Sequence, residues 1–382
     1  MLDAFFGNIA LMIILTGALV GCASTLVGTF LVLRGNSMLS DAISHSIILG
    51  IVVVWLLTGD TAGPVQILGA ALTGVLTVFL TELLFSTGRV KYDAAIGLVF
   101  PVLFSVGVLL LNLYARDVHI DQHSVLLGEI SFVWLDTMSV GGHDVPEALV
   151  FMSLVTVVNL LFVTLFYKEL KITTFDPGLA AALGFVPGIM FYALLLLVSA
   201  TGVAAFDAVG AVLFIAFVIV PPSAAYLLTD RLWLMLVYGA LISIASSVLG
   251  YFIAVALDVS IGGMMAVMTG VFLALAFLFG PRHGIIARAC RRRGQRQENQ
   301  LRTVAVHLYA HEDTAERTEE NVATALRTHL GWSRETAHRV MAAGISEDLF
   351  VRQGDMLTLT PKGRATARSI LEPWRTEGLG AP

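Results

Sequence analysis

A carboxylate and an imidazole stand four residues apart where an apolar run begins, in the segment Ser37-Met-Leu-Ser-Asp41-Ala-Ile-Ser-His45. On a helix, residues four apart share one face, and Ser37 lies one further turn back on that face. Ionisable groups are costly within a membrane, and an oxygen and nitrogen pair suits a divalent first-row metal ion. The spacing therefore favours a metal site made of Asp41 and His45, with Ser37 supplying a hydroxyl or holding a water. The alternative is a helix-start pair, with Asp41 as the cap and His45 bonded to a neighbouring helix.

Composition indicates the class of protein that must position this pair. Of the 382 residues, 57% are hydrophobic and 13% are charged, whereas soluble domains carry about 25% charged residues. Runs near the ~20 residues that cross a bilayer lie at 5–33, 39–58, 64–86, 94–114, 147–167, 187–203, 206–228, 232–257 and 261–280. The sequence predicts an all-α polytopic membrane protein with nine transmembrane helices in membrane lipid, and eight is the alternative count.

The basic residues predict the orientation of these spans. Eleven of the twelve Lys and Arg residues before position 295 fall in loops that one topology places in the cytoplasm, and Arg116 is the exception. Positively charged loops stay inside. With nine spans, we expect an outer amino terminus and a cytoplasmic carboxyl terminus.

A composition break separates a C-terminal segment from the membrane part. We place a transmembrane domain at 1–285, a basic linker at 286–300, a cytoplasmic domain at 301–372 and a tail at 373–382. Within the third of these, the pattern predicts helices at 301–311, 319–330 and 333–343, strands at 349–351 and 356–360, and a last helix at 361–371. Ser333 is the expected N-cap of the third helix.

This order of helices, hairpin and helix resembles the small α+β winged-helix domain of metal-dependent repressors. From residue 295 onward the chain has 11 basic and 12 acidic residues, so its net charge is 11 − 12 = −1. Proteins that bind nucleic acid usually present a basic face. We therefore expect weak DNA binding, and a regulatory or protein-contact role is an equal alternative.

Four segments of the membrane part, in chain order, resemble the permease family of zinc, manganese and iron ABC importers. They are Gly28 to Ser46, Lys91 to Phe100, Phe175 to Gly184 and Val220 to Ala225, and the resemblance covers residues 5–285. It implies a second permease subunit, two separate ATPase subunits and an extracytoplasmic metal-binding protein, in the inner membrane of a prokaryote. It implies a transported ion and no resident cofactor. Manganese is favoured, partly from the repressor-like extension, and zinc and iron remain open.

The resemblance also implies roles for single residues. Phe175, Asp176, Ala180 and Gly184 would form a cytoplasmic coupling helix, with the small residues at 180 and 184 letting an ATPase approach; an amphipathic linker is the alternative. Gly97 would permit tight helix packing. The chain contains no Gly-x4-Gly-Lys-Ser/Thr phosphate loop, so hydrolysis would belong to a partner and this chain would not be an enzyme.

Three further features carry weaker predictions. Pro221 and Pro222 remove two backbone donors inside an apolar run, which predicts a helix break there. Asp207, earlier in the same run, would be an outer gate or a secondary ion contact, or else a solvated helix start. His119, Asp121 and His123 alternate like zinc ligands on a strand, but receptor docking or a structural role is favoured.

Two rival functions stay open at this stage. A proton-coupled secondary metal transporter would need no ATPase, and its carboxylates would titrate during transport. A membrane-bound, metal-responsive transcription regulator would use the membrane part as a sensor. The coupling segment and the four matched segments favour the importer over both.

Overall fold

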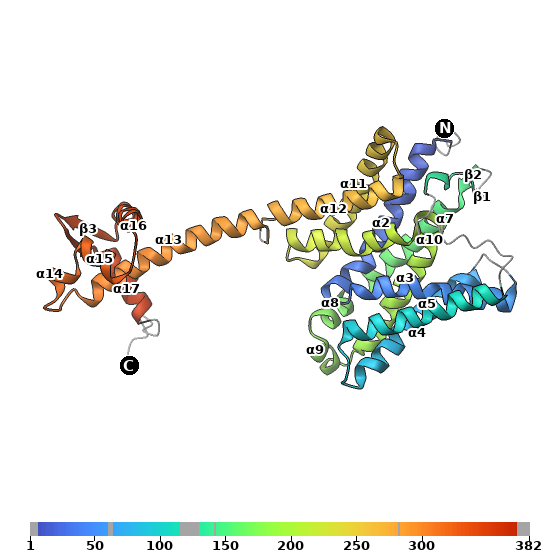
Figure 1. Cartoon of the computed structure of the whole chain (residues 1–382), viewed down its shortest axis with the longest axis horizontal. Coiled ribbons are helices and arrows are strands. Elements are labelled where there is room, and N and C mark those ends of the chain that lie inside the picture. Colours follow the sequence, from blue (N-terminus) through green and yellow to red (C-terminus); the bar gives the residue numbers. More distant parts are fainter. Residues whose placement is uncertain (1–6, 60–63, 115–129, 141–142, 282, 373–382) are drawn as a thin grey trace. The chain divides into compact units, whose positions relative to one another are not determined.

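The chain divides into two compact units, Met1–Ile285 and Ile286–Pro382. They are seen in a computed structural model that describes residues 7–59, 64–114, 130–140, 143–281 and 283–372. Each unit is described here by itself. The first unit is helical and apolar, and the second is a small unit of helices and one hairpin (Figure 1).

Among the described residues, nine helical segments are long and apolar enough to cross a membrane, which confirms the predicted nine runs. Seven are separate helices: α2 (Ile9–Leu33), α3 (Met38–Thr58), α4 (Pro64–Ser86), α5 (Tyr92–Tyr114), α7 (Glu147–Leu165), α11 (Leu232–Leu257) and α12 (Ile261–Phe279). The other two, Pro187–Phe206 and Ala208–Leu228, are joined in α10 (Pro187–Leu228).

Helix α2 lies at the centre of the membrane unit, where it packs against α10, α11 and α7. Its fully buried Val27 and Phe30 belong to one apolar cluster with Phe214 and Phe217 of α10. Small residues allow this packing, because a Cβ at Gly21 would lie 2.7 Å from Ser243 Cβ of α11. Leucine and phenylalanine side chains remain exposed on the outer helices, as a lipid-facing surface requires.

The interruption of α10 lies at Gly210 and not at the two prolines. Gly210 has φ 75° and ψ 168°, the only non-helical dihedral angles recorded inside α10. The helix continues through Pro221 and Pro222 to Leu228, so the predicted break at these prolines is wrong. A glycine adopts positive φ without strain, which is why the chain is interrupted there.

The neighbouring helix α2 compensates for the donors that the prolines lack. In an α-helix their N–H groups would bond the carbonyls of Phe217 and Val218. Thr25 Oγ1 donates instead to Phe217 O at 3.3 Å, and Ser243 Oγ lies 2.7 Å from Thr25 Oγ1. Gly28 leaves room for the Val218 carbonyl, since a Cβ at Gly28 would overlap its oxygen. Helix α2 thus supplies a donor to the Phe217 carbonyl and leaves space for the Val218 carbonyl, and α10 continues as a helix past both prolines.

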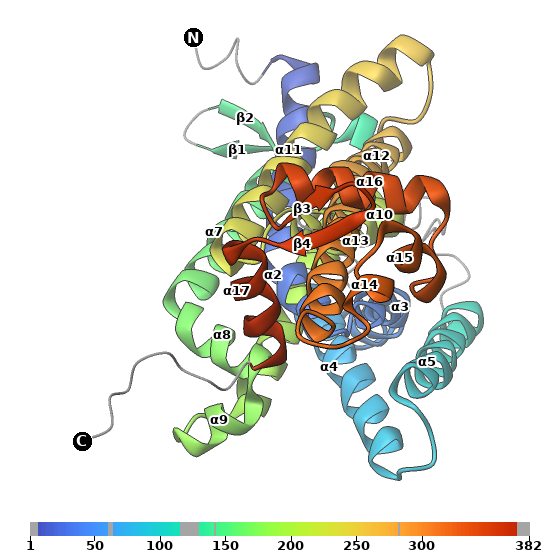
Figure 2. The ribbon, with the colours of Figure 1, turned by 90° about the vertical axis from the view of Figure 1, so that its left-hand side faces the viewer.

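Short elements mark the two ends of the membrane unit (Figures 1 and 2). At one end, β1 (Thr137–Val140) pairs antiparallel with β2 (His143–Pro146), after the 3-10 turn η1 (Ile130–Phe132). At the other end lie α8 (Tyr167–Phe175) and α9 (Pro177–Ala182). The α8 and α9 end carries Lys168 and Lys171, which the charge pattern predicts to be cytoplasmic.

The C-terminal unit follows the predicted order of elements, with two differences. Its elements are α13 (Ile285–Ala310), α14 (Arg317–Glu320), α15 (Ala323–His329), α16 (Arg334–Ser346), β3 (Phe350–Gln353), β4 (Met356–Leu359) and α17 (Pro361–Leu371). The range 286–300, predicted as a linker, forms the first part of α13. The N-cap at Ser333 is confirmed, because its hydroxyl accepts from Thr336 N at 3.2 Å.

The second difference is that the single helix predicted over 319–330 is divided into α14 and α15. Asn321 O accepts from Leu357 N at 2.7 Å, and Val322 forms an isolated bridge with Met356 of β4. Asn321 Nδ2 also donates to Leu308 O of α13 at 3.2 Å. These tertiary bonds keep Asn321 and Val322 out of the helical run, so the helix is interrupted there, and no local signal in the sequence shows them.

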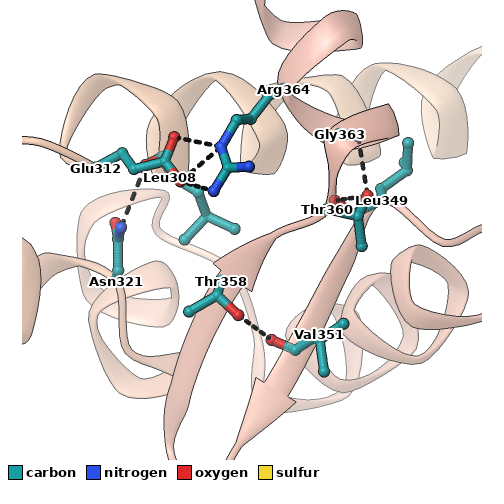
Figure 3. A network of polar contacts seen from close by, with 9 residues as sticks. All are labelled: Leu308, Glu312, Asn321, Leu349, Val351, Thr358, Thr360, Gly363 and Arg364. Carbon is teal, nitrogen blue, oxygen red and sulfur yellow. Dashed lines mark hydrogen bonds and ion pairs between the residues drawn. The ribbon is translucent and has the colours of Figure 1, made fainter.

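Polar contacts and two glycines hold the β3–β4 hairpin between α16 and α17 (Figures 2 and 3). A Cβ at Gly344 would overlap the Phe350 ring, and one at Gly363 would overlap Leu349 O. Thr360 caps α17 by accepting from Gly363 N at 3.0 Å (Figure 3). The Arg364 guanidinium donates to both carboxylate oxygens of Glu312 at 2.7–2.9 Å. The hairpin and its last helix are therefore fixed within this unit.

Candidate metal pathway and coupling segment

The first turns of α3 present Asp41 and His45 together, as the i, i+4 spacing predicts. His45 Nε2 lies 3.5 Å from Asp41 Oδ1, and the two side chains are 33% and 38% exposed respectively. Helix α3 rises about 1.5 Å per residue, so His45 lies roughly one and a half to two turns inside the span. One carboxylate and one imidazole on one face can bind an ion but leave coordination positions open to other donors.

Two phenylalanines of α5 hold the His45 ring. Phe100 stacks on it with ring centroids 5.8 Å apart, and Phe104 meets it edge-on at 6.1 Å. This contact needs α3 and α5 to approach closely, which Gly107 allows, since a Cβ there would lie 2.9 Å from Leu49 N. Gly97, predicted to serve tight packing, is instead exposed with open space around it. The close-packing glycine of α5 is therefore Gly107.

The opposite side of α3 is fixed against α4. Thr77 Oγ1 donates to Ser46 Oγ at 2.7 Å in a fully buried contact. At Gly50 a Cβ would lie 2.6 Å from Gly69 O, so the two backbones touch there. Helix α3 is thus held from two sides, and this sets the direction in which Asp41 and His45 point.

The other residues predicted to contact the ion are less defined. Ser37 precedes α3 as its N-cap but makes no side-chain capping bond; its carbonyl accepts from Ser40 Oγ at 2.7 Å. The backbone of Asp207 lies in α10, three residues before the interruption at Gly210, and its side chain lies outside the described residues. The segment His119 to His123 also lies outside them.

The segment predicted to couple to an ATPase forms a capped helix, and its exposed face differs from the predicted one. Asp176 Oδ1 accepts from Leu179 N at 2.8 Å and so begins α9. Ala180 is fully buried within the chain, so it does not offer the close approach predicted for it. Gly184 has φ +88° and open space around it, which fits a turn at the end of α9.

Three large apolar residues, four apart in sequence, form an exposed stripe, of which sequence reasoning named Phe175 and missed Leu179 and Leu183. Phe175, Leu179 and Leu183 are all exposed on the surface of α8 and α9. Leu179 and Leu183, in α9 and at its C-cap, follow the helical i, i+4 period, which is the signal that could have shown them. Phe175 ends α8, and the non-helical Asp176 separates it from α9. Exposed apolar patches of this kind mark protein or membrane contact surfaces.

Arg34 connects the coupling segment with the helix that carries the metal pair. It lies in the short loop between α2 and α3, and it donates to Thr173 Oγ1 at 3.2 Å and to Thr174 Oγ1 at 3.3 Å, both in α8. Its guanidinium also lies 5.0 Å from the ring centroid of Phe191 in α10. Burial lowers the pKa of Arg34, although an arginine stays charged. One side chain therefore touches α8 and α10 four residues before α3 begins.

The sequence of the membrane unit has relatives throughout its length, and residues 8–280 match the ABC 3 transport family. The chain belongs to this family. The membrane unit is therefore that of a multi-pass ABC transporter permease, a subunit that is not itself an enzyme. The nine spans described above account for the matched range.

Individual relatives of the ABC 3 family cover the chain to different extents. The zinc transport system membrane protein TroD of Treponema pallidum is 46% identical over 94% of this chain and 98% of its own length. The manganese transport system membrane protein MntD of Bacillus subtilis is 50% identical over 75% of this chain and 97% of its own length. The TroD match therefore extends into the C-terminal unit, whereas the MntD match is the length of the membrane unit.

A solved structure supports the same fold. The structure of PsaBC from Streptococcus pneumoniae in complex with Fab matches with a TM-score of 0.61 and 26% identity, over 74% of this chain and 98% of that chain. The coverage again equals that of the membrane unit.

Proposed function

We propose that this chain is the permease subunit of an ABC importer for divalent transition-metal ions, with manganese favoured and zinc or iron as alternatives. The observation that carries the proposal is the Asp41 and His45 pair, held on α3 between the α5 phenylalanines and the α4 contacts. A carboxylate oxygen and a neutral imidazole nitrogen are suitable donors for each of these ions. The names of the zinc and manganese relatives support the same class of cargo.

The exposure of the pair supports a dimeric permease. About a third of each side chain remains accessible in a single chain, and two ligands do not complete the shell of a transition-metal ion. A second permease subunit facing α3 would bring a matching pair, with waters filling the remaining positions. Asp41 and His45 are partly exposed in a single chain. In the dimer they would line a pathway between the two permease subunits.

The α8 and α9 segment would dock on one of two separate ATPase subunits. Phe175, Leu179 and Leu183 supply an apolar contact surface, and Arg34 joins this segment to the start of α3. A movement of α8 caused by ATP binding would thus reach the metal pair through one short loop. The opposite end, which carries β1 and β2, would face an extracytoplasmic metal-binding protein.

The C-terminal unit would be a winged-helix-like cytoplasmic domain that modulates transport. Its order of helices, hairpin and helix and the hairpin seated by Gly344 and Gly363 support this part of the proposal. The membrane would be the inner membrane of a prokaryote. The near-neutral charge of the unit favours regulation over tight DNA binding.

Substitution of the pair tests the proposed pathway. Asp41→Asn and His45→Gln each keep the shape of the side chain and weaken its ability to bind a metal ion, so cellular manganese uptake should fall at least about tenfold. Asp93→Asn is the matched control, because Asp93 is an exposed carboxylate in the first turn of α5. The complex should still assemble with its ATPase. Wild-type uptake by the Asp41→Asn, His45→Gln double variant would contradict the proposed site.

A further inference from the structure

Three helices of the C-terminal unit bring two imidazoles and a carboxylate together. His307 comes from α13, Glu320 from the end of α14 and His329 from the end of α15, and one ligand atom of each lies within 4.8 Å of the others. His307 Nε2 lies 3.7 Å and His329 Nδ1 lies 2.6 Å from Glu320 Oε2. In the part of the chain that the structure describes, no other group of three or more potential ligands converges in this way.

The cluster is held by the fold and is not a chance meeting of surface side chains. Asn321, next to Glu320, is buried and binds both Leu308 O of α13 and Leu357 N of β4. His307 lies one residue before Leu308 on α13, and its Nε2 donates to the backbone oxygen of Glu320 at 3.2 Å, a bond that this nitrogen would give up on binding an ion. The bonds that divide α14 from α15 therefore also place Glu320 against His307.

One oxygen of the carboxylate at the centre of the cluster, Glu320 Oε2, has no hydrogen-bond partner among the described residues. This oxygen is buried, and the nearest imidazole nitrogen, His329 Nδ1, lies 2.6 Å from it as an ion pair. A buried anionic oxygen without a partner is costly. A cation bound between the two imidazole nitrogens and this oxygen would remove that cost.

The separations suit a first-row divalent ion. Bonds of about 2.1 Å in a tetrahedral site place ligand atoms about 3.4 Å apart. The distances of 3.7 Å and 2.6 Å to Glu320 Oε2 lie on either side of that value, so sub-ångström shifts would complete the site. Two imidazoles and one carboxylate favour zinc, manganese, iron or cobalt over the oxygen-bound calcium and magnesium. His329 is 49% exposed, which leaves access for water as a further ligand.

We propose that His307, Glu320 and His329 form a second metal site, which binds a divalent first-row transition-metal ion in the C-terminal unit. His311 supports it from the side, since its ring centroid lies 5.0 Å from that of His307 and its Nδ1 lies 3.7 Å from Glu316 Oε2. A bound ion would join α13, α14 and α15, and it would stabilise this unit increasingly as the metal concentration rises above the dissociation constant. The unit would thereby respond to the metal concentration on its own side of the membrane.

Cobalt binding to the purified full chain tests the site without any measurement of transport. The detergent-solubilised protein, stripped with a chelator, is titrated with Co²⁺ alone, and visible d–d absorption reports coordination. The variants are His329→Gln and Glu320→Gln, and His338→Gln is the matched control because His338 is an exposed histidine of α16. An Asp41→Asn, His45→Gln variant separates the site from the membrane pair.

The wild type, the His338→Gln control and the membrane-pair variant should all show the saturable absorption. The affinity of His329→Gln and Glu320→Gln for Co²⁺ should fall at least about tenfold, with unchanged melting temperatures in chelator. Equal Co²⁺ affinity in wild type and His329→Gln would overturn the proposal and leave an ion pair alone. Loss of the absorption in the membrane-pair variant, with its retention in His329→Gln, would overturn it equally.

Discussion

Backbone carbonyl groups that lipid cannot solvate explain why particular residues occur at some positions of this chain. The prolines at 221 and 222 leave two carbonyls of α10 without their usual donors. Thr25 supplies a hydroxyl to one of them and Gly28 leaves space for the other. In a membrane such groups must be satisfied within the protein. The Pro-Pro sequence of α10 therefore depends on Thr25 and Gly28 of α2, which contact the two carbonyls that the prolines leave without donors.

Replacing Gly28 tests this pairing. In Gly28→Ala the new Cβ would overlap Val218 O, a backbone atom that cannot rotate away. Separating α2 from α10 at their central contact should cost about 2–4 kcal/mol, as overpacking of a tight interior does at its upper range. The measurement is unfolding in detergent with increasing sodium dodecyl sulfate. Gly97→Ala is the control, since its Cβ would meet open space, and equal stability of the two variants would contradict the pairing.

The metal pair shows what residue spacing can and cannot predict. Asp41 and His45 were predictable because both lie on one helix and helical geometry is local. Phe100 and Phe104 were not, because their contact with His45 depends on where α5 crosses α3, which Gly107 decides. Local patterns identify ligands, whereas tertiary packing identifies the residues that hold them.

At the scale of secondary-structure elements, the short helices α8 and α9 show which part of the predicted coupling segment is exposed. The segment Phe175 to Gly184, predicted to be a coupling helix, contains the short helix α9, and the Asp176 cap of α9 follows directly from the Asp-Pro-Gly sequence. The exposed face was predicted wrongly, because a pattern of small residues at 180 and 184 indicates close approach without showing to which surface. Ala180 packs inward, and the neighbouring leucines are exposed.

Leu179→Asp tests the stripe as the ATPase contact. Desolvating a carboxylate in an apolar interface should weaken the association with the ATPase at least about tenfold. The fold of the permease should be unaffected because Leu179 is exposed. The measurement is the amount of ATPase that co-purifies with the permease. The controls are Leu135→Ser and Leu135→Asp, at an exposed leucine just before β1. Normal recovery of the ATPase with Leu179→Asp would show that the ATPase docks on another surface.

At the scale of the whole molecule, hydropathy and charge predicted the division of the chain far better than its internal contacts. The apolar runs gave the nine spans because crossing a bilayer imposes a length and a composition. The interruption at Gly210 was missed because a glycine among apolar residues is common, and only the backbone shows positive φ. The cluster of His307, Glu320 and His329 was missed because its members are far apart in sequence and match no short metal motif.

Truncation after Arg293 tests whether the membrane unit is sufficient for transport. All nine spans end at Phe279 or earlier, and a relative named for manganese transport aligns over 97% of its own length with only 75% of this chain. The truncated chain should therefore import manganese at a rate within about threefold of wild type, on the ordinary scatter of non-additive effects.

Uptake is measured across a range of external manganese concentrations, and the full-length His329→Gln variant is measured in the same way. If the C-terminal unit senses metal, truncation and His329→Gln should change the dependence of uptake on metal supply in the same direction. A truncated chain that reaches the membrane with its ATPase but imports nothing would show that the C-terminal unit is part of the transport machinery itself.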